Sequence, residues 1–254
     1  MPNPQCPKCD GSGWVITERE ALSGASRCEC AFESRPALIE EKAGLPPLYR
    51  NASLENFLLP ADNPIANRAL STVMLIVRTY AREFPNTDKP GLLFIGEPGT
   101  GKTHLAVAAL RILISRGFEG VFFDYQNLLE RIRAGYDPAS GATERAAYQS
   151  ALDSEILLLD DLGAHRVTDW VEDTVTSLIT YRTNHRKPLI ATTNLHDPDI
   201  MGAPADRTAG GPGKTDYRIT LAERVGMRAR SRLFEMCKIV RMPQVEDFRM
   251  RRLR

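Results

Sequence analysis

Residues 91–106 read GLLFIGEPGTGKTHLA, a short apolar run that leads into a glycine-rich segment and then into a helix-forming stretch. The segment matches the pattern Gly-x4-Gly-Lys-[Ser/Thr] and stands between a predicted strand and a predicted helix, the context of a phosphate-binding loop. Glycines let the backbone curl so that its N–H groups point at phosphate oxygens, and the helix start adds partial positive charge. The stretch predicts a nucleotide site, with ATP as the expected ligand, built from Gly96, Glu97, Pro98, Gly99, Thr100, Gly101, Lys102 and Thr103.

Two side chains of this loop have distinct expected roles. We expect Lys102 to neutralise the β and γ phosphates and the Thr103 hydroxyl to bind Mg²⁺. A second segment, GGPGKT at 210–215, imitates the pattern. It has Thr208 where the first glycine is needed, and no apolar strand precedes it, so we interpret it as a surface loop.

The remainder of the chain alternates short apolar runs with helical patterns. After GLLFI, the runs are GVFFD, EILLLDD, KPLIATT and CKIVRM, at 120–124, 155–161, 187–193 and 237–242. One helix is expected from Asp62 to about Phe84, and others begin near Lys102, Gln126, Thr143, Thr168 and Tyr217. Alternating strands and helices predict an α/β fold of the P-loop NTPase type, with a five-stranded, mostly parallel sheet flanked by helices.

Polar residues end two of these predicted strands. ILLLDD places Asp160 where it can join the Mg²⁺ shell, and Asp161 where a general base or water-orienting carboxylate is needed. Asp is shorter than the Glu of many such ATPases, so slow hydrolysis or an ATP-driven switch remains open. LIATTN ends on Asn194, which we interpret as a neutral group that positions the attacking water; a simple capping role is the alternative.

Composition fits a globular protein. The chain has 254 residues and a net charge of +1, with no apolar run long enough to span a membrane. The N-terminus lacks a secretion-signal pattern, so we expect a cytoplasmic protein without membrane contact. Residues 218–254 hold ten Arg and one Lys against four acidic residues. This basic region favours phosphate contacts, although a solvated tail is an equal alternative.

Four of the five cysteines precede residue 31. They form a C-x2-C pair and a C-x-C pair, a spacing that can place four thiolates around Zn²⁺. We predict a zinc module at 1–35, a linker at 36–61 and an ATPase domain at 62–254. A redox pair or a disordered tail is the alternative, and Cys237 is expected in the core. The predicted zinc ligands are Cys6, Cys9, Cys28 and Cys30.

The motif order GKTHLA, DDLGA and TTN, at 101–106, 160–164 and 192–194, resembles the AAA+ ATPases of the DnaC/DnaI helicase-loader group and the related IstB transposition helpers. The resemblance covers about residues 45–245 and implies an AAA+ domain without the usual C-terminal lid. It also identifies Arg228 and Arg232, in VGMRARSRLFEMCKIV (225–240), with the arginine finger that acts on ATP in an adjacent subunit. An ordinary exposed basic helix is the alternative.

The resemblance implies a function. Subunits would associate on binding ATP, grip single-stranded DNA and hold a replicative helicase through the N-terminal module, with hydrolysis at subunit interfaces. Arg131, Arg133 and Tyr136 are candidate DNA contacts. Two alternatives remain: an IstB-like ATPase helper of a DNA transposase, and a scaffold that binds ATP but hydrolyses it slowly. IstB proteins generally lack an N-terminal zinc module, which favours the loader.

Overall fold

The computed structural model describes residues 6–10, 12, 14–19, 22–28, 37–135, 142–201 and 219–248. Its main element is a five-stranded sheet in the order β4-β5-β6-β3-β7, and all neighbouring strands are parallel. The strands are β3 (Gly91–Ile95), β4 (Gly120–Asp124), β5 (Ile156–Asp160), β6 (Leu189–Thr193) and β7 (Cys237–Arg241). All five predicted strands are therefore confirmed.

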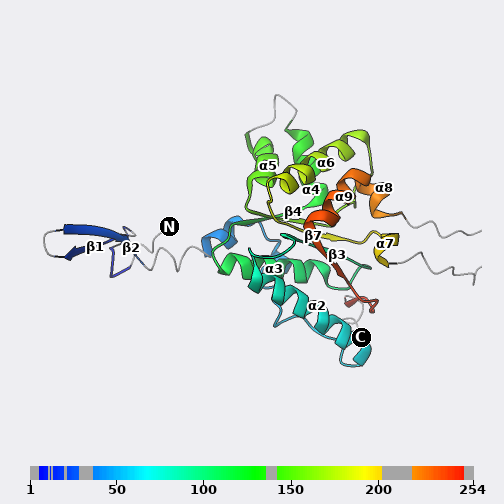
Figure 1. Cartoon of the computed structure of the whole chain (residues 1–254), viewed down its shortest axis with the longest axis horizontal. Helices are drawn as coiled ribbons and strands as arrows, with labels where there is room; N and C mark the ends of the chain where they lie inside the picture. Colours follow the sequence, from blue (N-terminus) through cyan, green and yellow to red (C-terminus); the bar gives the residue numbers. More distant parts are fainter. Residues whose placement is uncertain are drawn as a thin grey trace, which may run out of the picture.

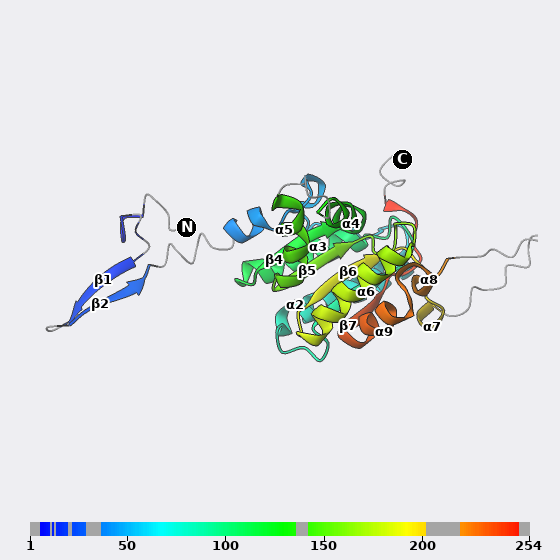
Figure 2. The same ribbon diagram turned by 90° about the horizontal axis from the view of Figure 1, so that it is seen from above.

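Helices cover both faces of this sheet (Figures 1 and 2). On one face, α2 (Pro64–Glu83) and α3 (Lys102–Ser115) pack against alternate strand residues such as Leu92, Phe94 and Leu158. The other face carries α4 (Tyr125–Ala134), α5 (Ala142–Asp153), α6 (Asp169–Asn184), α8 (Leu221–Val225) and α9 (Met227–Met236). The two buried clusters make a three-layer α/β arrangement, as predicted.

The predicted helix starts agree with the structure except near the C-terminal end. The Asn63 side chain accepts a hydrogen bond from the Ala66 N–H and so starts α2. The helix predicted near Tyr217 begins instead at Leu221, because Thr220 and Glu223 form a reciprocal capping box there. Tyr217 itself and the 210–215 segment lie outside the described residues. The helical conformation is interrupted at Gly226, whose φ of +83° separates α8 from α9.

The segment predicted as a linker contributes to the core. Residues 37–42 are helical, and Pro47–Tyr49 form a 3-10 turn, η1. Side chains from this region lie in the cluster on the α2/α3 face, among them Ala43, Leu45, Ala52 and Leu54. The domain boundaries at residues 35 and 61 stay predictions.

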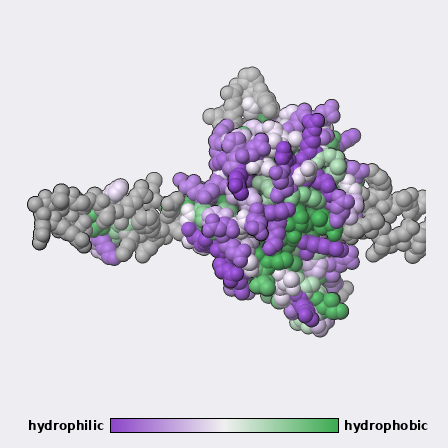
Figure 3. Space-filling model, in the orientation of Figure 1, coloured by the Kyte–Doolittle hydropathy of each residue, from purple (hydrophilic) through white to green (hydrophobic). Residues whose placement is uncertain are grey.

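Helix α2 is only partly covered. It buries Ala66, Leu70, Val73, Val77, Tyr80 and Ala81 but leaves Ile65 and Leu75 exposed. In Figure 3, apolar side chains gather on the face of the molecule that carries α2. Among the described residues, no helix has the length and apolar composition needed to cross a bilayer.

Arg182 of α6 is fully buried and connects three elements. Its guanidinium donates hydrogen bonds to carbonyl oxygens at the end of α5 and just before β5 and β6, those of Ala151, Leu152, Ser154, Glu155 and Pro188. Burial lowers the pKa of Arg182 to about 10, so the side chain is still charged at neutral pH. A buried charge held this way fixes how α5 and α6 lie against the sheet.

We predict that Arg182→Ala lowers the free energy of unfolding by about 3 kcal/mol, because several buried carbonyl groups lose their charged donor. Urea denaturation followed by circular dichroism measures this change. The matched control is Arg78→Ala on α2, whose side chain is 63% exposed; it should change the same quantity by less than about 0.5 kcal/mol. Equal losses in the two variants would refute a special role for Arg182.

Candidate nucleotide site and cysteine cluster

The phosphate loop curls between β3 and α3, as the motif predicts. Gly99 and Gly101 have φ values of +74° and +92°, in the left-handed region that suits glycine. Gly101 is the N-cap of α3, so the positive end of a 14-residue helix faces the loop. The Thr100 hydroxyl is buried and donates to the Glu97 carbonyl at 2.9 Å, which closes the curl.

Lys102 lies inside the loop with only 6% of its surface exposed. Its Nζ donates to the Gly96 carbonyl at 2.9 Å and to the Glu97 carbonyl at 2.8 Å. The ammonium group is thus held inside the curl of the loop by two of the loop's own carbonyl groups.

Asp160, at the end of β5, accepts hydrogen bonds from a threonine in the first turn of α3 and from a threonine near the end of β6. Thr103 Oγ1 donates to Asp160 Oδ1 at 2.9 Å, and Thr192 Oγ1 donates to the same oxygen at 2.6 Å. Burial raises the pKa of Asp160, while the hydrogen bonds from the two threonines act in the opposite direction. A partly buried carboxylate beside a hydroxyl is a donor pair that suits Mg²⁺. The structure thus brings together the two predicted Mg²⁺ ligands.

The predicted catalytic pair of this subunit is also in direct contact. Asn194 Nδ2 donates to Asp161 Oδ1 at 2.7 Å. Asp161 has a φ of +56°, and its backbone N–H donates to Thr192 Oγ1 at 2.9 Å. Left-handed backbone is uncommon outside glycine and here turns the chain sharply after β5. Asp161 and Asn194 therefore stand together at the sheet edge next to Asp160.

Two segments that the sequence did not indicate pack against the loop. The Phe248 N–H donates to the Gly99 carbonyl at 3.2 Å, and a Cβ at Gly99 would overlap the carboxylate of Asp247. A Cβ at Gly101 would likewise overlap the ring of Phe57. The positive φ angles favour glycine at both positions, and the side chains of Asp247 and Phe57 pack directly against them. No local pattern in the sequence signals either contact.

The predicted finger arginines lie on α9. The Arg228 residue is exposed, and the Arg232 side chain is 43% exposed and bonded to Glu235 Oε2 at 2.7 Å on the same helix. Arg230, between them, points elsewhere and forms an ion pair with Asp197 at 2.6 Å. Two neighbouring guanidinium groups are thus presented on the surface of one helix.

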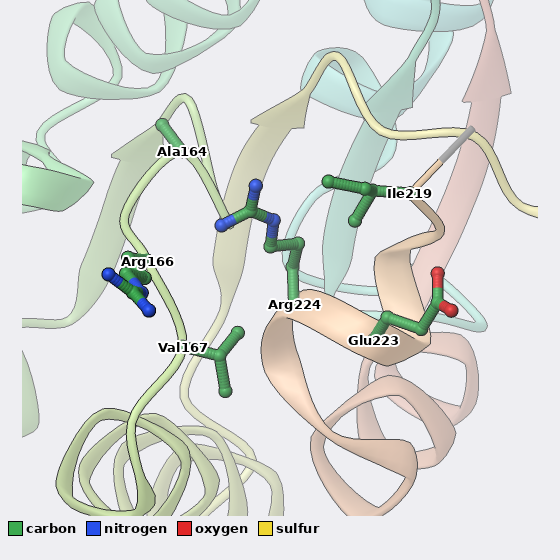
Figure 4. Close-up of a pocket in the computed structure, with 6 residues that line it drawn as sticks. All are labelled: Ala164, Arg166, Val167, Ile219, Glu223 and Arg224. Atoms are coloured by element: carbon green, nitrogen blue, oxygen red, sulfur yellow. The ribbon is translucent and has the colours of Figure 1, made fainter. Parts of the chain in front are cut away.

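Helix α8 borders a surface hollow of about 640 Å³ (Figure 4). Its lining comes from the loop after β5 and from the start of the α8 region: Ala164, Arg166, Val167, Ile219, Glu223 and Arg224. Arg224 extends from α8 toward that loop, and its Nη1 donates to the His165 carbonyl at 3.2 Å. The hollow adjoins the loop after Asp161 rather than the phosphate loop.

Three N-terminal cysteines form a compact cluster beside the hairpin of β1 (Trp14–Arg19) and β2 (Leu22–Arg27). Cys6, Cys9 and Cys28 are buried, their sulfur atoms lie within 4.8 Å of one another, and Cys6 Sγ is 3.7 Å from Cys28 Sγ. Thiolates bound to tetrahedral zinc at about 2.3 Å lie about 3.8 Å apart, so the spacing fits a zinc site. The predicted fourth ligand, Cys30, lies outside the described residues.

Cys237 is separate from this cluster. It lies in β7, fully buried, and burial raises the pKa of its thiol to about 12. A thiol held protonated in an apolar strand is a poor metal ligand and a poor nucleophile. This agrees with the predicted core position.

The predicted DNA-contacting residues make contacts within the subunit. Arg131 lies over the Phe123 ring at 5.7 Å, and Arg133 lies over the Trp170 ring at 5.1 Å. Tyr136 lies outside the described residues. Their role in DNA binding stays a prediction.

Comparison with known proteins places these features in a family. A family model described as IstB-like ATP binding protein matches residues 76–198. A solved structure titled as the DnaC helicase loader is 32% identical, with 78% of this chain and all of that chain covered and a TM-score of 0.60. A DnaI structure at 17% identity covers 79% of this chain and 95% of its own, with a TM-score of 0.57, and shows the common fold.

A replicative helicase loader DnaC from Escherichia coli K12 is 25% identical over 153 residues, which are 60% of this chain and 59% of that protein. This chain spans less than two thirds of the length of the curated relatives that it matches first.

We predict opposite effects on stability for two substitutions of Asp160. Asp160→Asn keeps an oxygen that accepts from Thr103 and Thr192 and removes a buried charge, so the free energy of unfolding should stay within about 1 kcal/mol of the original or rise. Asp160→Ala leaves two hydroxyl donors without their acceptor and should lower it by about 1–3 kcal/mol. Thermal and urea unfolding without nucleotide measure both. Any gain from Asn should shrink as the pH falls and Asp160 takes up its proton.

Proposed function

The chain belongs to the DnaC/DnaI group of AAA+ ATPases, with IstB-like ATP-binding relatives, and from this premise we propose that it loads a replicative helicase onto single-stranded DNA in an ATP-dependent manner. The hydrogen-bonded array of Thr103, Asp160, Asp161 and Asn194 beside the phosphate loop carries the ATP-dependent part of this proposal. The cysteine cluster supports the loader rather than a transposase helper.

Binding of ATP follows from the charges of the loop. Lys102 and the N–H groups at the start of α3 would hold the phosphates, and Thr103 and Asp160 would hold Mg²⁺. Bound Mg²⁺ supplies positive charge at the β and γ phosphates. Burial raises the pKa of Asp160, and a bound cation would stabilise its charged form.

Hydrolysis would depend on two subunits. Asp161 would accept a hydrogen bond from the attacking water, and Asn194 would hold the Asp161 carboxylate in place through their 2.7 Å contact. Arg232, helped by Arg228, would reach the γ phosphate bound by an adjacent subunit and stabilise charge there. ATP would thus join the subunits, and hydrolysis would release them.

The N-terminal module would hold the helicase. Cys6, Cys9, Cys28 and Cys30 would bind Zn²⁺, and the metal would stabilise a segment with little apolar surface of its own. Trp14 on β1 is 50% exposed.

Two other functions have specific support. The IstB-like family match to residues 76–198 also suits an ATPase that assists a DNA transposase. Asp161, one methylene shorter than Glu, suits a scaffold that binds ATP and turns it over slowly. Helicase binding separates the first from a loader, and turnover with single-stranded DNA separates the second.

The first test is co-purification with the cognate replicative helicase in ATP and Mg²⁺. We predict an ATP-dependent complex for the unchanged protein, and loss of both the complex and the bound zinc in Cys6→Ser/Cys9→Ser. Zinc is measured by atomic absorption and the complex by gel filtration. Cys237→Ala is the matched control and should keep both. An intact complex in the zinc-free variant would refute the zinc module as the helicase grip, and no complex in any form would favour the transposase helper.

The second test asks whether the finger acts between subunits. Lys102→Ala and Arg232→Ala should each lower ATP turnover by about a thousandfold or more. An equal mixture should regain about a quarter of the original turnover, because half of the sites are intact and half of those neighbour an intact finger. Phosphate release measures this. The double variant Lys102→Ala/Arg232→Ala, mixed with Lys102→Ala, should regain no turnover. If the reference mixture, Lys102→Ala with Arg232→Ala, also regains none, hydrolysis between subunits is refuted.

A further inference from the structure

A fully buried carboxylate lies three residues beyond Asn194. Asp197 has no exposed surface, and its two oxygens accept a paired hydrogen bond from Arg230: Nε to Oδ2 at 2.6 Å and Nη2 to Oδ1 at 2.7 Å. Arg230 Nη2 also donates to Asp199 Oδ2 at 2.6 Å. A buried charge needs such a partner, so this contact fixes the loop after β6 to α9.

Arg230 anchors α9 from the side opposite to the predicted finger. In a helix, residues four apart share a face and residues two apart point to nearly opposite sides. Arg228 is exposed and the Arg232 side chain is 43% exposed, whereas the Arg230 side chain is only 14% exposed and its guanidinium lies 4.2 Å from the centre of the Phe234 ring. Helix α9 is therefore anchored by Arg230 and carries Arg228 and Arg232 on its other side, toward the surface.

Other contacts fasten the same helical unit to both active-site loops. The Leu221 N–H donates to the His196 carbonyl at 2.9 Å, next to Asp197. Arg224 Nη1 donates to the His165 carbonyl at 3.2 Å, in the loop that follows Asp161 (Figure 4). Helices α8 and α9, together with α7 (Pro198–Met201), lie close to one another on the same side of the molecule in both views (Figures 1 and 2).

We propose that Asp197 and Arg230 are positioning residues that set the placement of Arg232 at the ATP site of the neighbouring subunit. This inference rests on the proposed function, because it requires hydrolysis between subunits. Neither residue touches nucleotide in this arrangement. They act through α9, which carries Arg232. The same Asp197–Arg230 contact attaches α9 to the loop that begins at Asn194.

The test uses Asp197→Asn, which removes the charge that holds Arg230 but keeps the shape of the side chain. We expect at least a tenfold loss of ATP turnover with binding of a fluorescent ATP analogue unchanged. Subunits of this variant should regain turnover when mixed with Lys102→Ala, which supplies an intact finger. Mixed with Arg232→Ala, they should reach about 5% of the original turnover or less, against about half for the unchanged protein in the same mixture, because their own finger is misplaced.

This pattern separates a misplaced finger from damage to the subunit's own site. If Asp197→Asn subunits raise the Arg232→Ala mixture to about half of the original turnover, as the unchanged protein should, their finger is intact and the proposal is overturned. Glu83→Gln, which removes an exposed ion pair with Arg82 on α2, is the matched control and should behave as the unchanged protein.

Asp199→Asn decides the outcome if Asp197→Asn fails to fold or to bind nucleotide. Asp199 is 75% exposed and accepts one additional hydrogen bond from Arg230, so this substitution keeps the buried pair of Asp197 and Arg230. We expect a two- to fivefold loss of turnover, and an equal mixture with Arg232→Ala that reaches only about 10–25% of the original turnover, against about half when the unchanged protein is mixed with Arg232→Ala. Full activity, or an Arg232→Ala mixture that reaches about half of the original turnover, overturns the proposal.

The reference mixture of Lys102→Ala with Arg232→Ala distinguishes the two levels of inference. If it regains turnover and the Asp197 and Asp199 variants do not follow the expected pattern, only the positioning role is refuted. If the reference mixture regains nothing, hydrolysis between subunits is refuted, and the positioning role with it.

Discussion

The two hydrogen bonds that Asp160 accepts from Thr103 and Thr192 join the end of β5 to the first turn of α3 and to the end of β6. Because β6 lies between β5 and β3 and all three are parallel, their carboxyl ends meet at one edge of the sheet. The phosphate loop, the acidic strand end and Asn194 can therefore share a site although about 100 residues of chain separate them. The carboxylate is partly buried, so its charge is costly until a cation arrives. The meeting of the strand ends around Asp160 therefore explains both how the site is assembled and why we expect it to bind a metal ion.

The loops at this edge are fastened to the rest of the molecule on two sides. The segment after β7 crosses the phosphate loop, where Phe248 bonds to Gly99, and Phe57 lies against Gly101. On the other side, α8 and α9 are bonded to the loops after β5 and β6 through Arg224 and Arg230. Strand-end loops are usually the variable part of such folds. Here their positions are determined by neighbours from both ends of the domain.

The sequence predicts whatever depends on local pattern. The five strands, the loop at 96–103 and the meeting of Asp160, Asp161 and Asn194 follow from apolar runs, one motif and the parallel-sheet rule. The Asp197–Arg230 pair could not be predicted, because two polar residues 33 positions apart leave no periodic trace. The start of α8 could have been found, since Thr220 and Glu223 have the spacing of a capping box. The packing of residues 43–54 was hidden by proline-rich, weakly periodic sequence.

Because the Asp161 side chain is short, the arginine finger would supply a larger share of the catalysis of ATP hydrolysis in the proposed loader. Its carboxylate is held by Asn194 at the rim of the site, and its reach toward an attacking water is shorter than that of Glu. A weak water-orienting group leaves more of the barrier to be lowered by charge stabilisation, which the neighbour's arginine supplies. The rate of ATP turnover would then depend on the assembly of subunits more than on the binding of ATP. A subunit alone would hold ATP as a stable ligand, and correct docking of α9 from the next subunit would start the hydrolysis that ends the complex.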